Sequence, residues 1–364
     1  MSDDSSSTSS PIRRACDRFG LHLPHVLAAI EQTSRKHEEI AHLQHAGVGR
    51  LPDNTALVIF GSFARDEITR SSDLDWTFLV DGRADPQHFK IASEIGHTCK
   101  QAGFAAPGTT MTFGTMASSH ELIHHIGLDE DTNRNFTRRM LLLLESRSVA
   151  GEVIHHRVIR GILDRYLVAE RSVAWNPDER QVPRFLLNDI VRFWRTMAVD
   201  YAAKKWQQDN KWALRNAKLR MSRKLLYASG LLICFNCELE PPAPGPQQQS
   251  IFPDEPDPDM TLLNYVFEQS RMTPLNILAN AIVNNEADGE TAGRILSSYD
   301  RFIEILNDTE YREHLANLPL DRAKTDSRFG EIREIGHRFQ DGLDRLFLKS
   351  NDRLRDLTLK YGIF

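Results

Sequence analysis

Residues 58 to 80 read Val-Ile-Phe-Gly-Ser-Phe-Ala-Arg-Asp-Glu-Ile-Thr-Arg-Ser-Ser-Asp-Leu-Asp-Trp-Thr-Phe-Leu-Val, the most informative stretch of this chain. The apolar run Ala56 to Phe60 predicts a buried strand, and Gly61-Ser62 predicts a turn directly after it. A second predicted strand, Leu74 to Val80, alternates apolar side chains with Asp73, Asp75 and Thr77. Because side chains two positions apart on a strand share a face, both aspartates are predicted to project into one pocket.

Each part of this stretch suits the binding of a nucleoside triphosphate. Gly61 lets the backbone approach a phosphate, and the Ser62 hydroxyl with adjacent amides can hold phosphate oxygens at a helix start. Asp73 and Asp75 can hold Mg²⁺ that is also bound to the substrate phosphates. Metal ions in such a site activate an attacking hydroxyl and neutralise the leaving pyrophosphate. The predicted reaction is therefore NMP transfer from an NTP or dNTP.

The Gly-Ser turn, the spacer and Asp-x-Asp together resemble the DNA polymerase β-like nucleotidyltransferase superfamily over residues 56 to 82. The resemblance implies an α+β fold in which a small mixed sheet has helices on one side. It also implies two divalent ions (Mg²⁺ or Mn²⁺) held by the catalytic pair Asp73 and Asp75, and no covalent intermediate. Family members usually carry a third carboxylate on a neighbouring strand, whereas Phe104 to Ser118 contains no Asp or Glu. Glu121, the Asp129-Glu130-Asp131 cluster and the absence of a third ligand remain open alternatives.

A basic segment, Arg184 to Lys224, holds eleven Lys or Arg against three Asp, although the whole chain has 50 acidic and 45 basic residues. Helical spacing predicts that Lys211, Arg215, Lys218 and Ser222 share one face. The functional interpretation is that cations hold triphosphate oxygens while one of Trp194, Trp206 and Trp212 stacks on the base. The alternative is a solvated helix face with tryptophans packed in the core. The predicted nucleotide-binding residues are Gly61, Ser62, Arg65, Arg192, Arg215, Lys218 and Ser222.

Composition and helical periodicity divide the chain into five predicted parts. They are a disordered tail (residues 1 to 10), a catalytic domain with an N-terminal helix (11 to 151), a helical nucleotide-cleft domain (152 to 237), a Pro-rich linker or loop (238 to 259) and a C-terminal helical region (260 to 364). Within the catalytic domain we also predict a strand at Thr110 to Phe113 and helices at Pro86 to Gln101, Glu121 to Ile126 and Thr132 to Ser146.

Several sequence features bear on location and on other metal sites. No apolar run reaches the roughly 18 to 20 residues that span a bilayer, and no apolar segment follows the polar N-terminus. The four cysteines form no disulfide pattern, so a cytoplasmic protein is expected. Cys234 and Cys237 have a zinc-type spacing without a second pair nearby, and the adjacent pairs His124-His125 and His155-His156 point to different sides of a helix. Neither feature predicts a metal site.

The leading functional prediction is a template-independent nucleotidyltransferase with an NTP or dNTP substrate, a hydroxyl acceptor and no membrane partner. Its product is predicted to be an oligonucleotide signal, as in anti-phage defence. One alternative is toxin-like transfer of NMP to a protein or tRNA. Another, from a different class, is a nucleotide-binding regulator without catalytic activity. The sequence does not decide the base, the sugar or the oligomeric state.

Overall fold

The computed structural model describes residues 10–105, 107, 112–171, 182–207, 211–239 and 258–362. These residues fall into two compact units, which we describe separately. The helical unit comprises Met1–Ala29, Ile190–Phe235 and Pro274–Phe364, and the sheet unit comprises Ile30–Asp189 and Asn236–Thr273.

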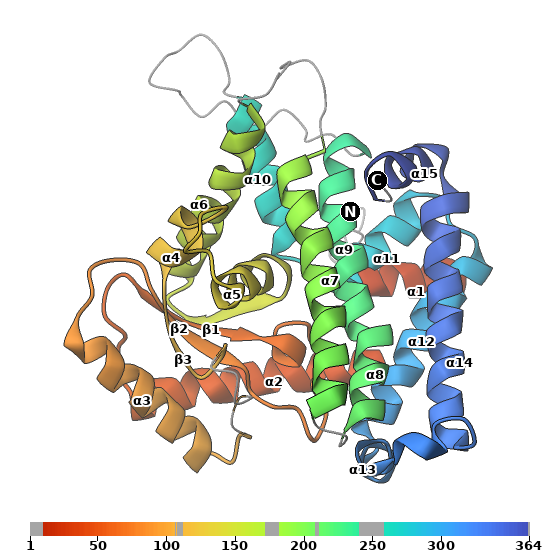
Figure 1. Cartoon of the computed structure of the whole chain (residues 1–364), viewed down its shortest axis with the longest axis horizontal. Coiled ribbons are helices and arrows are strands. Elements are labelled where there is room, and N and C mark those ends of the chain that lie inside the picture. Colours follow the sequence, from red (N-terminus) through yellow and green to blue (C-terminus); the bar gives the residue numbers. More distant parts are fainter. Residues whose placement is uncertain are drawn as a thin grey trace, which may run out of the picture. The chain divides into compact units, whose positions relative to one another are not determined.

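The sheet unit contains one sheet of four strands in the order β3-β2-β1-β4 (Figure 1). The strands are β1 (Thr55–Phe60), β2 (Trp76–Val80), β3 (Thr115–Ser118) and β4 (Ser146–Ala150). β1 pairs antiparallel with both β2 and β4, whereas β2 and β3 are parallel. The sheet is therefore mixed, and the predicted α+β fold with a small mixed sheet and a large helical region is confirmed.

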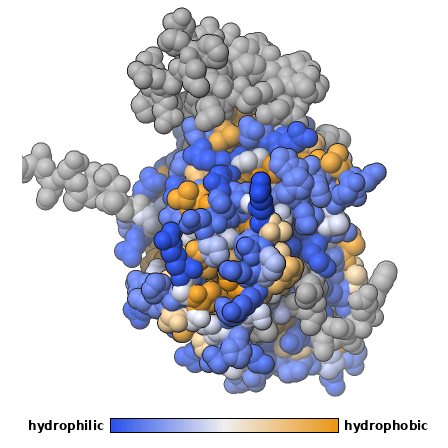
Figure 2. Space-filling model, turned by 90° about the vertical axis from the view of Figure 1, so that its left-hand side faces the viewer, coloured by the Kyte–Doolittle hydropathy of each residue, from blue (hydrophilic) through white to orange (hydrophobic). Residues whose placement is uncertain are grey.

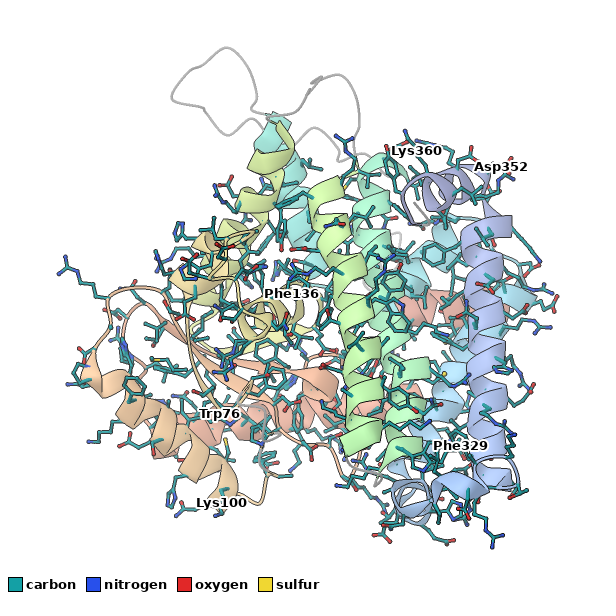
Figure 3. The ribbon with its side chains drawn as sticks, in the orientation of Figure 1. Trp76, Lys100, Phe136, Phe329, Asp352 and Lys360 are labelled. Atoms are coloured by element: carbon teal, nitrogen blue, oxygen red, sulfur yellow. The ribbon has the colours of Figure 1, made fainter. Side chains whose placement is uncertain are left out.

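Helices cover both faces of this sheet. The sheet unit contains most of α2 (Pro24–Gly47), all of α3 (Pro86–Gln101), α4 (Ser119–His124), α5 (Asn133–Leu144), α6 (Glu152–Arg171) and α10 (Pro258–Ser270), and the start of α7 (Arg184–Gln207). Every residue of β1 and β2 is buried. Trp76 and Phe136 lie on opposite sides of the sheet (Figure 3). The expectation of helices on only one side is therefore wrong.

The alternation predicted for the second strand is present. Leu74, Trp76, Phe78 and Val80 belong to one hydrophobic cluster, which also includes Ile40 of α2 and Ile95 of α3. Asp75 and Thr77 alternate with these residues and so point to the opposite side of the chain, and Asp73 directly precedes Leu74. The predicted strand start is too early, however, because β2 begins at Trp76 and the two aspartates precede it.

The outer surface on the side occupied by α3 and α4 is mostly hydrophilic (Figure 2). Hydrophobic residues appear there as separate spots. The large exposed hydrophobic side chains of the sheet unit are Phe89, Leu128, Val153 and Phe185. Within the ranges that the structure describes, none of the helices has both the length and the apolar character that a bilayer crossing requires.

The helical unit is built around the contact between two long helices. It contains α1 (Pro11–Phe19), most of α7 and of α9 (Ser222–Leu239), α8 (Trp212–Arg220), α11 (Pro274–Asn284), α12 (Gly289–Asn307), α13 (Thr309–Asn317), α14 (Ser327–Arg345) and α15 (Asp352–Leu357), with short helical turns at Leu320–Arg322, Leu346–Ser350 and Thr358–Gly362. A β-carbon on Gly342 of α14 would lie 2.6 Å from Ile295 Cγ1 of α12. Glycine therefore permits the close approach of these helices.

The two units do not follow the five predicted parts. The N-terminal helix α1 packs against α11 and belongs to the helical unit, whereas α6 packs against β1 and β4 and belongs to the sheet unit. The predicted tail (residues 1 to 10) and linker (238 to 259) lie almost wholly outside the described residues.

Besides the start of β2, the strands β3 and β4 differ from the sequence-based expectation. The predicted strand Thr110 to Phe113 lies partly outside the described residues, and the observed β3 begins later, at Thr115. The other difference is β4, which we did not predict. The sequence predicts that its first residue, Ser146, ends the preceding helix, whereas α5 ends at Leu144 and Ser146 pairs with Phe60 of β1.

Candidate active site

The Gly-Ser segment forms a tight helical turn directly after β1. Gly61 has a φ of 66° and begins a short 3₁₀ helix, Gly61–Phe63. The amides of Ala64 and Arg65 both donate to Gly61 O at 3.0 Å, and Glu67 N donates to Ser62 O at 2.9 Å. Gly61 is suited to this position because only glycine adopts a positive φ without a steric cost.

The carboxylate of Asp75 lies against this turn. A β-carbon built on Gly61 would lie 3.4 Å from Asp75 Oδ2. The main chain is fixed there too, because Phe60 N donates to Asp75 O at 2.9 Å. The structure therefore brings together Gly61 and Asp75, as the sequence predicts.

Asp73 completes the predicted pair from an exposed position. Leu74, between the two aspartates, is 1% exposed and packs in the hydrophobic cluster. Asp75 lies between Leu74 and Trp76 of that cluster, so its side chain points away from the cluster, and Asp73 lies two positions before it. Thr77 follows on the same side, and its hydroxyl is buried without a hydrogen-bond partner among the described residues.

Arg65 is held inside the protein by two acidic side chains. Its Nε donates to Glu67 Oε2 at 2.8 Å, and its Nη1 donates to Glu145 Oε2. The side chains of Arg65, Glu67 and Glu145 are only 13%, 5% and 9% exposed. Glu145 directly precedes β4, so this ion-pair cluster joins the turn to the strand beside it. A bond from Arg65 to a phosphate would have to compete with these two carboxylates.

A second group of side chains supports the turn from α2 and β4. His37 Nε2 lies 2.8 Å from Phe63 O and therefore carries the hydrogen, so its Nδ1 accepts from Arg147 Nη1 at 3.1 Å. The same Arg147 nitrogen donates to Asp66 Oδ1 at 3.0 Å. Burial lowers the pKa of His37, and the charge of Arg147 lowers it further. His37 is thus held neutral under the turn.

The available donors fit Mg²⁺ better than a metal that needs an all-protein cage. Among the described residues, no three His, Cys, Asp or Glu side chains are grouped so that they could hold a metal ion. Mg²⁺ keeps several waters and is commonly bound by one or two carboxylates together with substrate phosphates. Asp73 and Asp75 beside the glycine turn provide such a pair.

For Asp131 and Glu121, two of the predicted sources of a third carboxylate, the geometry gives no support. Asp131 is bound by Arg139, whose Nη1 and Nη2 donate to its two oxygens at 3.0 and 2.7 Å. Glu121 belongs to α4, which follows β3 at Ser118. Ser118 pairs with Val80 at the end of β2 remote from Asp75.

Sequence reasoning missed Glu145 as a residue of this region. The available signal was a single acid at the end of the apolar run Met140 to Leu144. The sequence predicts that it lies inside the helix Thr132 to Ser146, where an acid normally faces solvent.

The remaining predicted nucleotide ligands lie in the helical unit. Arg192 is exposed on α7, Arg215 and Lys218 lie on α8, and Ser222 begins α9. The four residues do not share one continuous helix, because α8 ends at Met221 (φ −112°, ψ −89°) and a new helix, α9, begins after it. Ser222 is buried and its hydroxyl donates to Lys218 O at 3.2 Å, so this side chain serves the junction of the two helices.

The tryptophans of the basic segment have different environments. Trp212 is buried, donates from Nε1 to Leu318 O at 2.6 Å and packs edge-on against Phe329. It is a core residue, as in the alternative interpretation. Trp194 stacks on Tyr227 with ring centroids 5.3 Å apart, and the side chain of Trp206 lies outside the described part.

No protein-family model matches this chain, and no curated protein matches it.

Proposed function

We propose that the sheet unit is the catalytic core of a metal-dependent, template-independent nucleotidyltransferase. The observation that supports this most is the carboxylate of Asp75 lying against Gly61, in a turn that follows a buried strand. Asp73, two positions earlier in the chain, supplies a second carboxylate. The resemblance of residues 56 to 82 to the polymerase β-like superfamily agrees with this arrangement.

In this proposal the chain's own residues bind and orient the triphosphate. The amides at the start of the Gly61–Phe63 turn and the Ser62 hydroxyl hold phosphate oxygens, since the first N–H groups of a helical turn point toward its start. Asp73 and Asp75 hold the divalent ion, Mg²⁺ or Mn²⁺, with two ions expected. When bound, the metal supplies charge neutralisation at the phosphates and activation of the acceptor hydroxyl.

The reaction forms one bond and breaks one. The acceptor oxygen forms a bond to the α-phosphorus, the α-phosphorus–oxygen bond to the β-phosphate breaks, and pyrophosphate leaves with that electron pair. The acceptor proton passes to water. Arg65 takes no part in phosphate binding in this scheme, because Glu67 and Glu145 already engage it. Its role is to hold the turn in place.

Incubation of the full chain with Mg²⁺ or Mn²⁺ and each common NTP and dNTP tests this proposal. Mass spectrometry of the small molecules and of the protein should find a species heavier by one or more NMP units. Free oligonucleotides would support signal synthesis, and labelled protein or added tRNA would support a toxin-like acceptor. No NMP transfer to any of these acceptors would overturn the proposal.

A nucleotide-binding regulator is the second candidate. It is favoured by one observation, that the stretch Phe104 to Ser118, where the superfamily usually carries a third carboxylate, contains no Asp or Glu. Calorimetry distinguishes the two functions. Nucleotide binding that persists in Asp73→Asn/Asp75→Asn, together with no pyrophosphate release by the parent, would select the regulator.

We also place the protein in the cytoplasm as part of this proposal. None of the four cysteines, Cys16, Cys99, Cys234 and Cys237, forms a disulfide bond. Free thiols are usual in a reducing compartment, where nucleoside triphosphates and Mg²⁺ are also available.

A further inference from the structure

Three histidines of the sheet unit lie together at α4. His120 and His124 are separated by one helical turn, and their ring centroids are 4.9 Å apart. The ring of His125, just after the helix, lies 5.5 Å from that of His120 and nearly perpendicular to it. In the sequence, the adjacent pair His124-His125 hides the spacing of four positions between His120 and His124.

The backbone that carries these histidines is fixed by buried contacts. Leu122 is 1% exposed, and Ser119 Oγ donates to Asp81 Oδ1 at 2.6 Å. Ile123 packs so closely on α6 that a β-carbon on Gly161 would lie 2.9 Å from its Cδ1. His120 and His124 are exposed on the opposite side of this anchored turn.

The spacing of the rings suits a common zinc ion. Two imidazoles that each bind one Zn²⁺ at about 2.0 to 2.1 Å in a tetrahedral arrangement have ring centres roughly 5 Å apart. The measured separations are 4.9 and 5.5 Å. Two histidines four positions apart on one helix face are also the spacing with which helices bind Zn²⁺.

An independent observation concerns His125. Its Nδ1 is buried and has no hydrogen-bond partner among the described residues. A buried imidazole nitrogen normally has a partner, because leaving it unpaired costs free energy. A metal-bound arrangement of this ring would remove that cost.

We propose that His120 and His124, with His125 turned toward them, bind one Zn²⁺ ion at the surface of the sheet unit. No three ligands are already in place among the described residues, so the ring of His125 rotates when the ion binds and water fills the remaining position. The imidazoles of His120 and His124 bind the ion first, and the imidazole of His125 then becomes the third protein ligand.

This site is separate from Asp73 and Asp75. Ser118, which precedes α4, pairs with Val80, five positions along the chain from Asp75. Five strand steps correspond to about 16 Å. The proposal therefore does not depend on nucleotidyl transfer, and either can fail without the other.

The test is a zinc titration of the metal-free full chain in competition with a chromophoric chelator. The parent should bind one equivalent of Zn²⁺. His120→Ala/His124→Ala removes two coordinating imidazoles and should weaken Zn²⁺ binding on the order of 100-fold or more. His125→Ala removes one imidazole and should weaken it about tenfold. A matched double variant of two exposed histidines elsewhere, His97→Ala/His337→Ala, should bind as the parent does.

Three results would overturn the proposal: a parent that binds no Zn²⁺, a His120→Ala/His124→Ala variant that binds it unchanged, or loss of the ion in Asp73→Asn/Asp75→Asn. Circular dichroism of each variant serves as the control for folding. If the double variant does not fold, the single substitution His124→Gln on the exposed face gives the same comparison, with an expected loss of about tenfold or more.

Discussion

At the scale of single residues, the turn after β1 depends on the backbone of Gly61. Its φ of 66° disfavours any residue with a side chain, by about 1–2 kcal/mol. Gly61→Ala should therefore lower the free energy of unfolding by about this amount. It should also reduce NMP transfer by about tenfold or more, because the added methyl group faces Asp75 Oδ2 and displaces bound phosphate. Urea unfolding and pyrophosphate release measure the two effects.

Gly49 provides a matched control for this substitution. It also has a positive φ, 77°, but a β-carbon there would meet no atom within 4 Å. Gly49→Ala should cost similar stability and leave the rate of transfer unchanged. Equal loss of activity in the two variants would show that the turn has no specific role in the reaction.

Arg65 is predicted to matter for stability more than for direct phosphate contact. Arg65→Ala leaves Glu67 and Glu145 buried without their cation, so the free energy of unfolding should fall by about 3–5 kcal/mol. The comparison is Arg50→Ala, which removes a pair with Asp53 whose side chains are 87% and 86% exposed. That loss should be only about 0–1 kcal/mol. Similar values for the two variants in urea unfolding would contradict the buried ion-pair cluster.

At the scale of elements, His155 couples α6 to β4 in a pH-dependent way. Its Nε2 lies 2.8 Å from Ser146 Oγ, whose own hydrogen is donated to Leu142 O. Burial, with help from the neighbouring His156 and Arg271, lowers the pKa of His155 to about 3. The folded protein thus keeps this ring neutral under conditions in which the unfolded chain protonates it.

The sign of the pH effect follows from proton binding. Below about pH 6.5 the unfolded chain binds a proton that the folded protein does not, so stability falls as the pH falls toward 3. His155→Gln removes this titration while keeping a donor near Ser146. When the pH falls from 7 to 5, the free energy of unfolding should decrease by about 2 kcal/mol less in the variant than in the parent. His42→Gln, on the exposed surface of α2, should behave as the parent; equal pH dependence in all three proteins would contradict the assignment.

The elements that the sequence predicts well are those whose signal is local. The apolar run at β1 and the alternation around Trp76 each indicate a buried strand, and α3 has the predicted bounds, with Asp85 capping its start. The strand β4 was missed because Ser146–Ala150 lacks a strong apolar pattern. Its strand conformation depends on pairing with β1, about 90 residues earlier in the chain, and local propensity does not report such pairing.

At the scale of the whole molecule, grouping of elements could not be predicted from the order of residues. Composition placed α1 with the catalytic domain, yet its packing partner is α11. Likewise the partner of Arg65, Glu145, is 80 positions away in the chain. The glycine, serine and aspartates of the candidate site were all found from the sequence because they fall within 15 residues of one another. Contacts between distant segments needed the structure.

The role of the helical unit in nucleotide binding is still a prediction from its charge. Lys218→Ala should raise the KM for nucleotide about tenfold with a smaller change in kcat, because a cation that holds ground-state phosphate contributes mainly to binding. Steady-state kinetics of Lys324→Ala, which removes an exposed cation from the same unit, provides the control. An unchanged KM in Lys218→Ala would remove this residue from the nucleotide site.

Pyrophosphate release with Mg²⁺ and the full set of NTPs and dNTPs tests the central claim most directly, that Asp73 and Asp75 beside the glycine turn support nucleotidyl transfer. The parent should release pyrophosphate, and Asp73→Asn and Asp75→Asn should each reduce the rate by on the order of 100-fold or more. Asp164→Asn, which changes an exposed acid of the same unit, should keep the parent's rate. Turnover that survives in both aspartate variants would contradict the claim.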